Sequence, residues 1–183
     1  MLKRASYVVT GTEIGKREIC GAFDVSPDRV RMLPHPTPRF ALDGKKGSTP
    51  PLDRLGIRSP YVFYPAQFWA HKNHISLVEA IAELRDEGMR IDCVLVGSDK
   101  GNRAFVEKRA KELRVEAQIF FPGFVSREEL IALYRNALTL VYPSLCGPEN
   151  LPPLEAMALG CPVIAADIDG AKEQLGDAAV LVR

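Results

Sequence analysis

Residues 142–165 read YPSLCGPENLPPLEAMALGCPVIA, and this stretch decides how the rest of the chain is interpreted. Its composition predicts a strand end, a turn rich in glycine and proline, a short helix and a second strand. Pro152 and Pro153 suit the first turn of a helix, where no backbone N–H is needed, and Gly160 suits its end. Glu155 is therefore predicted to lie in the first or second helical turn, near the positive end of the helix dipole.

The turn before this helix is a candidate binding site for an anion. Gly147, Asn150 and Leu151 are predicted to offer free backbone N–H groups there. A helix N-terminus that follows a flexible turn attracts phosphate, because its N–H groups point toward the ligand. The working hypothesis is that this stretch holds a sugar nucleotide.

The sequence around this stretch alternates between strand and helix patterns. Helical spacing of apolar residues occurs at 73–87, 102–113 and 126–136, and Ser126 and Glu129 form a capping box at the start of the last segment. The predicted strands lie at 61–64, 91–96, 118–121, 139–142, 162–165 and 179–182. This alternation predicts an α/β fold with a Rossmann-like parallel six-stranded sheet and helices on both faces, which binds ligands beyond the C-terminal strand ends.

Three segments are predicted along the chain. Residues 1–34 form a strand–helix–strand unit of their own. Residues 35–57 are rich in proline and glycine, with two adjacent lysines, which is a linker composition. Residues 58–183 carry the regular alternation and form the main domain.

Composition narrows the function classes. The 183 residues carry a net charge of +1, which gives no electrostatic case for nucleic-acid binding. No apolar run is long enough to span a membrane, and no signal-peptide core is present, so a cytoplasmic location is the default expectation. Cys93 and Cys161 lie in or beside apolar strands and are expected to be buried, reduced thiols. GxGxxG and P-loop motifs are absent. The histidine spacing does not predict a metal site, and no DxD pair occurs in a loop before the fourth strand of the main domain.

The loop after the first strand of the main domain carries a second candidate. Lys72 stands just before a helix start at Asn73, where a cation and helix N–H groups can hold a diphosphate without a metal. A solvated lysine is the alternative interpretation. His71 and His74 are predicted to be surface or capping residues rather than catalysts.

Other candidates leave two interpretations open. Gly97 either approaches a ligand through its backbone or forms a surface turn, and the small Gly123 either admits a flat base or serves packing. Glu149 and Glu155 are paired carboxylates around a helix start. Glu155 either accepts hydrogen bonds from sugar hydroxyls or only complements the helix dipole. Glu173 is expected to be a solvated helix residue.

These motifs together resemble a known family. The stretch PSLCGPENLPPLEAMALGCPVIA is similar to the donor-site signature of family-four retaining glycosyltransferases, which have the GT-B fold. The resemblance covers nearly the whole chain. It is supported by four further segments: KNH with its following helix, VLVG, FFPGFVSREEL and GDAAVLV. It implies that residues 1–34 are the end of the N-terminal domain and that 58–183 are most of the C-terminal, donor-binding domain.

The resemblance also implies roles for single residues. Glu155 matches the second glutamate of the E-x7-E motif, which binds the donor ribose, and Lys72 matches the lysine on the donor diphosphate. Backbone N–H groups around Asn150 and Leu151 match those that meet the diphosphate or sugar. Phe124 or Val125 matches the segment whose backbone meets the base.

Two positions depart from the family pattern. The first glutamate of the motif falls at Gly147, and the chain has Glu149 two positions later. Glu149 is therefore the substitute candidate for contact with the donor sugar, and with Lys72 it is the predicted catalytic residue. The arginine that usually precedes the lysine by five positions is Gln67. A neutral amide donates hydrogen bonds but cannot neutralise a phosphate, which leaves Lys72 and the helix end to stabilise the leaving group.

The function implied is transfer of a hexose from a UDP- or GDP-sugar to a hydroxyl acceptor with retention of configuration, in polysaccharide or glycoconjugate synthesis. No metal cofactor is implied. The acceptor, a glycan or lipid-linked sugar, is expected on the rest of the N-terminal domain, and the full-length enzyme is expected in the cytoplasm or peripheral at the inner membrane. The chain ends directly after a strand, so a fragment that binds donor without turning it over is expected. A non-catalytic nucleotide-sugar-binding or assembly module and another GT-B enzyme, such as a sugar-nucleotide epimerase or a glycogen phosphorylase-like protein, remain alternatives.

Overall fold

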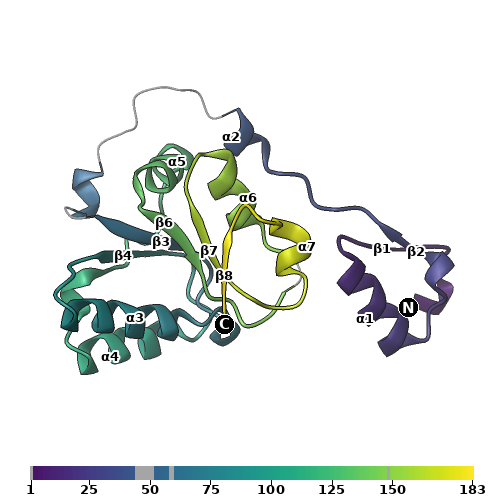
Figure 1. Cartoon of the computed structure of the whole chain (residues 1–183), viewed down its shortest axis with the longest axis horizontal. Helices are drawn as coiled ribbons and strands as arrows, with labels where there is room; N and C mark the ends of the chain where they lie inside the picture. Colours follow the sequence, from purple (N-terminus) through teal and green to yellow (C-terminus); the bar gives the residue numbers. More distant parts are fainter. Residues whose placement is uncertain (1, 44–51, 58–59, 148) are drawn as a thin grey trace.

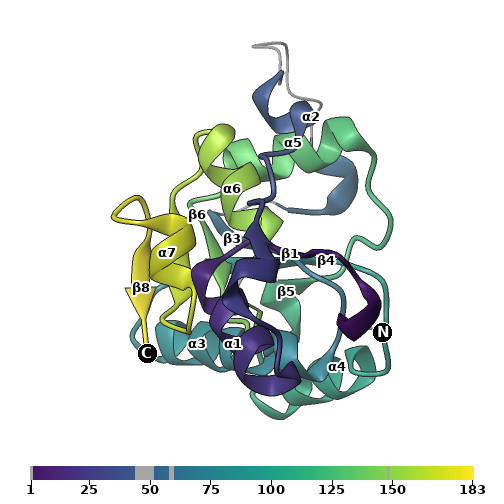
Figure 2. The same ribbon diagram turned by 90° about the vertical axis from the view of Figure 1, so that its right-hand side faces the viewer.

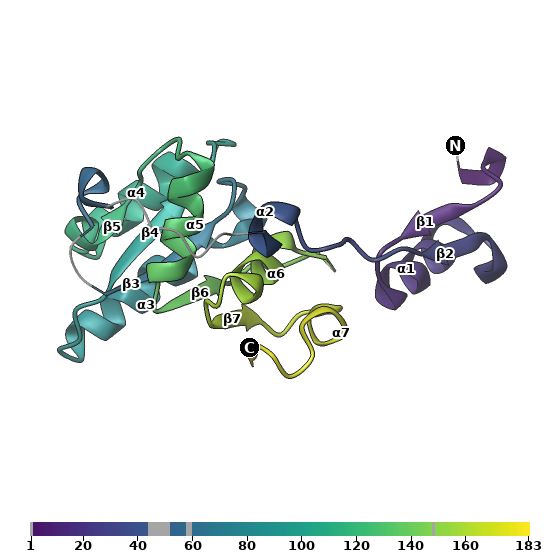
Figure 3. The ribbon, with the colours of Figure 1, turned by 90° about the horizontal axis from the view of Figure 1, so that it is seen from above.

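The computed structural model describes residues 2–43, 52–57, 60–147 and 149–183. The N-terminal unit consists of β1 (Val8–Thr10), α1 (Glu13–Phe23) and β2 (Val30–Met32), and its two strands pair in parallel. The Thr12 hydroxyl caps α1 by accepting a hydrogen bond from the N–H of Gly15 at 3.0 Å. Figures 1 and 3 show this unit set apart from the main sheet.

The main domain is built on one parallel sheet of six strands in the order β5-β4-β3-β6-β7-β8. Its strands are β3 (Tyr61–Pro65), β4 (Asp92–Val96), β5 (Ile119–Phe120), β6 (Thr139–Tyr142), β7 (Val163–Ala166) and β8 (Val180–Val182). Each lies within one residue or two of its predicted position. The predicted fold class and strand set are therefore confirmed.

Helices cover both faces of this sheet, as Figures 1 and 2 show. α3 (His74–Asp86) and α4 (Arg103–Glu112) pack together on one face. α5 (Arg127–Asn136) and α6 (Leu151–Ala158) lie on the other, and α7 (Ala171–Leu175) stands beside them before β8. No helix among the described residues is both long enough and apolar enough to cross a membrane.

The core lies where the central strands are covered twice. Phe63 and Tyr64 of β3 and Val94 of β4 are fully buried. Strands enclosed by helices on both faces carry continuous apolar runs, which explains the unbroken YVFYP of β3. Cys93 and Cys161 are buried free thiols, as predicted.

The capping box of α5 forms as predicted. The Ser126 hydroxyl accepts from the N–H of Glu129 at 3.2 Å, and the Glu129 carboxylate accepts from the N–H of Ser126 at 2.8 Å. Arg54 also binds this carboxylate, and its hydrogen bond lowers the pKa of Glu129 to about 2. The segment that precedes β3 is thereby tied to the start of α5.

The predicted linker is partly structured. Within 35–57, α2 (Arg39–Leu42) packs against α6, and the side chain of Ala41 is buried in the main core. Ile57 is buried there as well. Residues 44–51 lie outside the described part of the chain. The division at 34 and 57 stays a prediction, and the segment around α2 is helical and packed against the main domain.

His74 was placed on the surface by sequence reasoning, and the structure corrects this. Its side chain is fully buried at the start of α3, where it stacks on Phe68 with ring centroids 4.4 Å apart. Its Nε2 lies 3.3 Å from the carbonyl oxygen of Ala66, whereas Nδ1 is buried with no partner. Burial lowers the pKa of His74 to about 4. A polar residue at the start of a helix is usually predicted to be a cap. Here the first residue of the helix instead points into the core.

Candidate functional site

Lys72 lies where two loops meet at the C-terminal edge of the sheet. The short 3-10 helix Ala70–Lys72 follows β3, and the Tyr64 hydroxyl donates to the carbonyl oxygen of Lys72 at 2.8 Å. The loop after β6 is joined to this turn, because the N–H of Leu145 donates to the carbonyl oxygen of His71 at 2.9 Å. Two strands thus fix the backbone that carries the lysine.

The Lys72 ammonium is surrounded by neutral oxygen atoms. Its Nζ lies 3.1 Å from the Tyr142 hydroxyl, 3.4 Å from the Ser144 hydroxyl and 3.4 Å from Oδ1 of Asn150. Lys72 takes part in none of the ion pairs found in the described part of the chain. Burial lowers its pKa. A half-buried cation without a carboxylate partner is suited to bind an anion.

Asn150 connects this lysine to the start of α6. It is the N-cap residue of α6, and Pro152 and Pro153 occupy the first turn, as predicted. Its N–H, predicted to be free for a ligand, instead donates to Oε1 of Gln174 at 3.0 Å. That prediction is wrong, because a side chain from α7, 24 residues later, reaches this donor first.

Glu155 faces α5 from the second turn of α6. Its carboxylate accepts a hydrogen bond from the Tyr134 hydroxyl at 2.6 Å, and burial raises its pKa. Burial, with a smaller contribution from the Glu155 charge, raises the pKa of Tyr142, which bonds to Lys72. Glu155 and Lys72 thus each bond to a tyrosine hydroxyl in this part of the structure, and their roles toward a ligand stay predictions.

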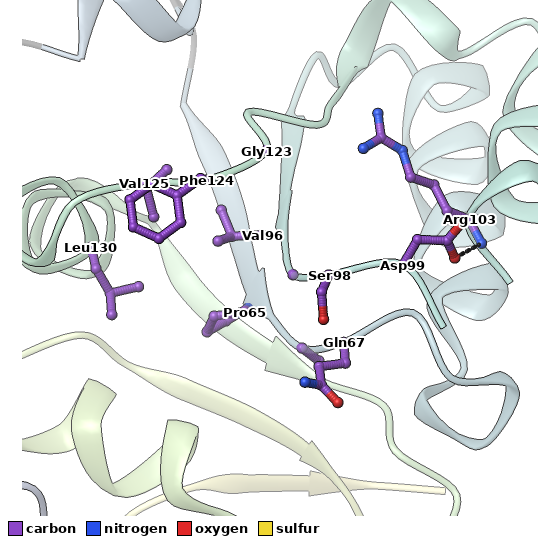
Figure 4. Close-up of a pocket in the computed structure, with 12 residues that line it drawn as sticks. Pro65, Gln67, Val96, Ser98, Asp99, Arg103, Gly123, Phe124, Val125 and Leu130 are labelled. Atoms are coloured by element: carbon purple, nitrogen blue, oxygen red, sulfur yellow. Dashed lines mark hydrogen bonds between the residues drawn. The ribbon is translucent and has the colours of Figure 1, made fainter. Parts of the chain in front are cut away.

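A cavity of about 580 Å³ opens at the C-terminal edge of the same sheet, between the loops after β3, β4 and β5. Figure 4 shows Phe124, Val125 and Leu130 at one end of it, with Gln67, Ser98, Asp99 and Arg103 at the other. Phe124 is 93% exposed, so its ring is available to a ligand. Four of the predicted site residues line this one cavity: Gln67, Gly97, Phe124 and Val125.

Gly97 has a structural reason to be glycine. A Cβ added there would lie 2.1 Å from the carbonyl oxygen of Ala66, because the loops after β3 and β4 touch at this point. The N–H of Phe68 donates to the carbonyl oxygen of Ser98 at 3.0 Å in the same contact. The glycine lines the cavity, but its close approach is to protein backbone.

Gly97→Ala is expected to destabilise the chain by about 1–3 kcal/mol, because backbone must move to admit the methyl group. Gly21→Ala is the matched control. Gly21 lies inside α1 with nothing within 4 Å of an added Cβ, so alanine should leave stability equal or higher by about 0.5–1 kcal/mol. Urea unfolding of both variants measures the difference. Equal stabilities would show that the two loops separate at no cost.

Glu149 occupies a different place from Lys72 and Glu155. Its carboxylate lies 3.4 Å from the N–H of His35, and an added Cβ at Gly11 would meet it. With Glu173 and Gln174 it lines a second cavity of about 410 Å³, whose other wall comes from the N-terminal unit. Glu149 is therefore held near His35, whereas Glu155 bonds to Tyr134, and a catalytic role for Glu149 stays a prediction.

Sequence reasoning missed several residues that the fold brings to the site: Tyr134, Tyr142, Ser144, Arg103 and Gln174. Tyr142 and Ser144 stand at the end of a predicted strand, on the edge where ligands bind, and this position was a usable signal. No signal in the sequence marks Gln174. Glu173, predicted to be solvated, is exposed but accepts hydrogen bonds from α1. The described residues contain no group of three His, Cys, Asp or Glu side chains that could hold a metal ion.

A comparison with known families gives a match over most of the chain. The model of the family described as glycosyl transferases group 1 matches residues 54–182. The chain belongs to the glycosyl transferases group 1 family. The match spans the whole six-stranded sheet, both sides of the cavity and the Lys72 cluster.

Curated relatives in this family include enzymes with different sugar products. The O-antigen chain mannosyltransferase RfbU of Salmonella typhimurium is 25% identical over 181 residues, which is 99% of this chain and 48% of that protein. The D-inositol 3-phosphate glycosyltransferase of Acidothermus cellulolyticus is 30% identical over 176 residues, 91% of this chain and 39% of that protein. The chain thus spans less than half the length of these two relatives.

Solved structures of glycosyltransferases share the fold. The glycosyltransferase of Rickettsia africae superposes with a TM-score of 0.83 at 21% identity, over 97% of this chain and 49% of that one. Anabaena HepE, in complex with UDP and glucose, gives 0.77 at 20% identity over the same shares. The predicted C-terminal half of a GT-B fold is confirmed.

Proposed function

We propose that this chain is the donor-binding part of a retaining glycosyltransferase that moves a hexose from a nucleotide-diphosphate sugar to a hydroxyl acceptor. The observation that carries the proposal is the Lys72 ammonium, half-buried among neutral oxygens at the start of α6. A cavity lined by an exposed aromatic ring opens at the same edge of the sheet. A diphosphate would give this ammonium the negatively charged partner that it does not have among the described residues. The complex of the structural relative HepE with UDP and glucose supports the same ligand class.

In this proposal each part of the site has a task. The cavity at Phe124 and Val125 holds the base, and the Glu155 carboxylate accepts hydrogen bonds from the ribose hydroxyls. Lys72 binds the diphosphate and, together with the dipole of α6, stabilises the charge that develops on it as the glycosidic bond breaks. Such preorganised stabilisation contributes about 3–4 kcal/mol to lowering a barrier. We expect no metal cofactor at this site.

Glu155→Gln tests the proposal directly. The amide keeps the size of the side chain and can still accept from Tyr134, but it loses the charge that strengthens hydrogen bonds to ribose. We expect the affinity for a UDP- or GDP-sugar to fall about tenfold, with thermal stability unchanged or slightly higher, because burial disfavours the ionised form. Calorimetric titration with each nucleotide sugar measures the affinity.

Glu128→Gln is the matched control, because Glu128 is an exposed residue in the first turn of α5. Its removal should leave the affinity unchanged. Binding that is equal in Glu155→Gln and in the natural chain would remove Glu155 from the ribose site. If neither UDP- nor GDP-sugars bind the natural chain, the assembly-module alternative gains and the donor proposal fails.

Acceptor and location are also proposals. The names of the relatives, which include O-antigen mannosyltransferases, support a glycan or lipid-linked acceptor for the whole enzyme. Such an acceptor would bring the enzyme to the cytoplasmic side of the inner membrane. Because the acceptor contacts belong to the rest of the protein, we expect no sugar transfer by these 183 residues, and measurable turnover would overturn that expectation.

A further inference from the structure

The short helix α7 is fixed in place although it has only five residues. Ala171 and Leu175 anchor it with buried side chains. Figures 1 and 3 show it between α6 and the N-terminal unit. The helix therefore lies next to both α6 and the N-terminal unit.

Gln174 joins α7 to the start of α6 through both ends of its side-chain amide. Oε1 accepts from the N–H of Asn150 at 3.0 Å, and Nε2 donates to the carbonyl oxygen of Asn150 at 3.0 Å. One amide therefore holds the donor and the acceptor of one backbone residue, as a neighbouring strand would. This fixes the orientation of Asn150 before α6 begins.

The Asn150 side chain connects the held backbone to Lys72. Its Oδ1 lies 2.8 Å from the Tyr142 hydroxyl and 3.4 Å from Nζ of Lys72, and its Nδ2 donates to the carbonyl oxygen of Gly147 at 2.9 Å. Backbone and side chain of Asn150 are thus both held. One of the three oxygens around the ammonium depends on a residue of α7.

Glu173, the residue before Gln174, binds the N-terminal unit. Its two carboxylate oxygens accept from the N–H groups of Glu13 at 2.6 Å and Ile14 at 3.2 Å, in the first turn of α1. A carboxylate at a helix N-terminus satisfies free donors and complements the helix dipole. Neighbouring residues of α7 thus hold α1 and the N-cap of α6.

We propose that Gln174 is a positioning residue for Lys72, acting through Asn150, and that α7 couples the contact with the N-terminal unit to the geometry of the Lys72 site. When Glu173 leaves α1, α7 loses its hydrogen bonds to the N-terminal unit, and the Gln174–Asn150–Lys72 chain loosens. The consequence for donor binding rests on the proposed function. The positioning itself does not.

The positioning is tested without a ligand by NMR titration of the Lys72 side chain, assigned with Lys72→Arg. The titratable neighbours of its ammonium are Tyr142, Cys146 and His74, and none of them is changed. In Gln174→Ala the ammonium is expected to move toward water, and the pKa of Lys72 should rise toward its ordinary value. Lys172→Ala, an exposed position on the same helix, is the control and should leave it lowered.

A pKa of Lys72 in Gln174→Ala equal to that of the natural chain would overturn the proposal. Gln174→Asn provides a second variant if alanine unfolds the chain. It keeps an amide that is one methylene too short to hold both groups of Asn150, and the same upward shift is expected. A loss of thermal stability without this shift marks a purely structural role and contradicts positioning.

The coupling through Glu173 is tested with Glu173→Gln and the double variant. Glu173→Gln should shift the pKa of Lys72 in the same direction but less, and the double variant should shift it less than the sum. Additive shifts would refute coupling. With UDP and GDP as probes, Gln174→Ala should bind about tenfold more weakly than Lys172→Ala. Absence of UDP and GDP binding by the natural chain defeats the proposed function alone, because the ligand-free titration still decides the positioning.

Discussion

Replacing Lys72 with methionine is expected to weaken the binding of UDP or GDP by about 10- to 100-fold, the range that follows from losing a charged hydrogen-bond donor. The same change should leave the fold as stable as before, or more stable. The reason is that the ammonium is half-buried among Tyr142, Ser144 and Asn150 without an anion, so its charge costs free energy until a ligand arrives. Stability and binding are therefore expected to move in opposite directions.

The pH dependence follows from the lowered pKa of Lys72. At every pH below that pKa the buried charge lowers the free energy of unfolding. The free energy of unfolding rises as pH increases through the pKa, because the folded chain then loses the proton. A bound diphosphate favours the charged form, so affinity should fall as pH rises, beginning at a lower pH than an exposed lysine would show. In Lys72→Met this alkaline decline should disappear.

Lys108→Met is the matched control for Lys72→Met. Lys108 is an exposed residue of α4 that pairs with Glu112, and it lies outside the proposed site. Calorimetry at constant ionic strength measures both affinities, and urea unfolding measures both stabilities. Equal nucleotide affinities in the two variants would show that the diphosphate does not bind at Lys72.

Acid is expected to destabilise this protein strongly through one histidine. The pKa of His74 is lowered to about 4, so between about pH 6.5 and pH 4 the unfolded chain binds a proton here and the folded chain does not. Stability therefore falls as pH falls through this window, by about 3 kcal/mol from this group alone. The structural cause is the buried Nδ1, which has no acceptor for the proton it would gain.

Two variants isolate this effect. His74→Asn and His74→Phe cannot titrate, and the phenyl ring can keep the stack on Phe68. Each is expected to be less stable than the natural chain at pH 7 but to lose about 3 kcal/mol less on going to pH 4. Urea unfolding at several pH values gives the difference. Parallel pH profiles for all three proteins would mean that His74 is protonated in the folded state without cost.

The sequence by itself determined the six-stranded sheet and helix α6, which carries Glu155. Apolar runs such as YVFYP, the Ser126–Glu129 capping box and the prolines before Glu155 are local signals. Each signal involves residues within one helical turn or one strand, and the structure has the predicted strand, cap or helix start at each position. Parallel topology then placed Lys72 and the start of α6 at one edge, because parallel strands end on the same side.

Only the tertiary structure decided what each polar group binds. The N–H of Asn150 is taken by Gln174 from 24 residues away, Glu149 lies near His35 instead of beside Glu155, and His74 enters the core. Such pairings depend on contacts between elements that are distant in sequence, and no periodicity or capping rule encodes them. Polar groups shielded from water must find partners, so the packing of α7 and the N-terminal unit, rather than the local motif, sets the geometry around Lys72.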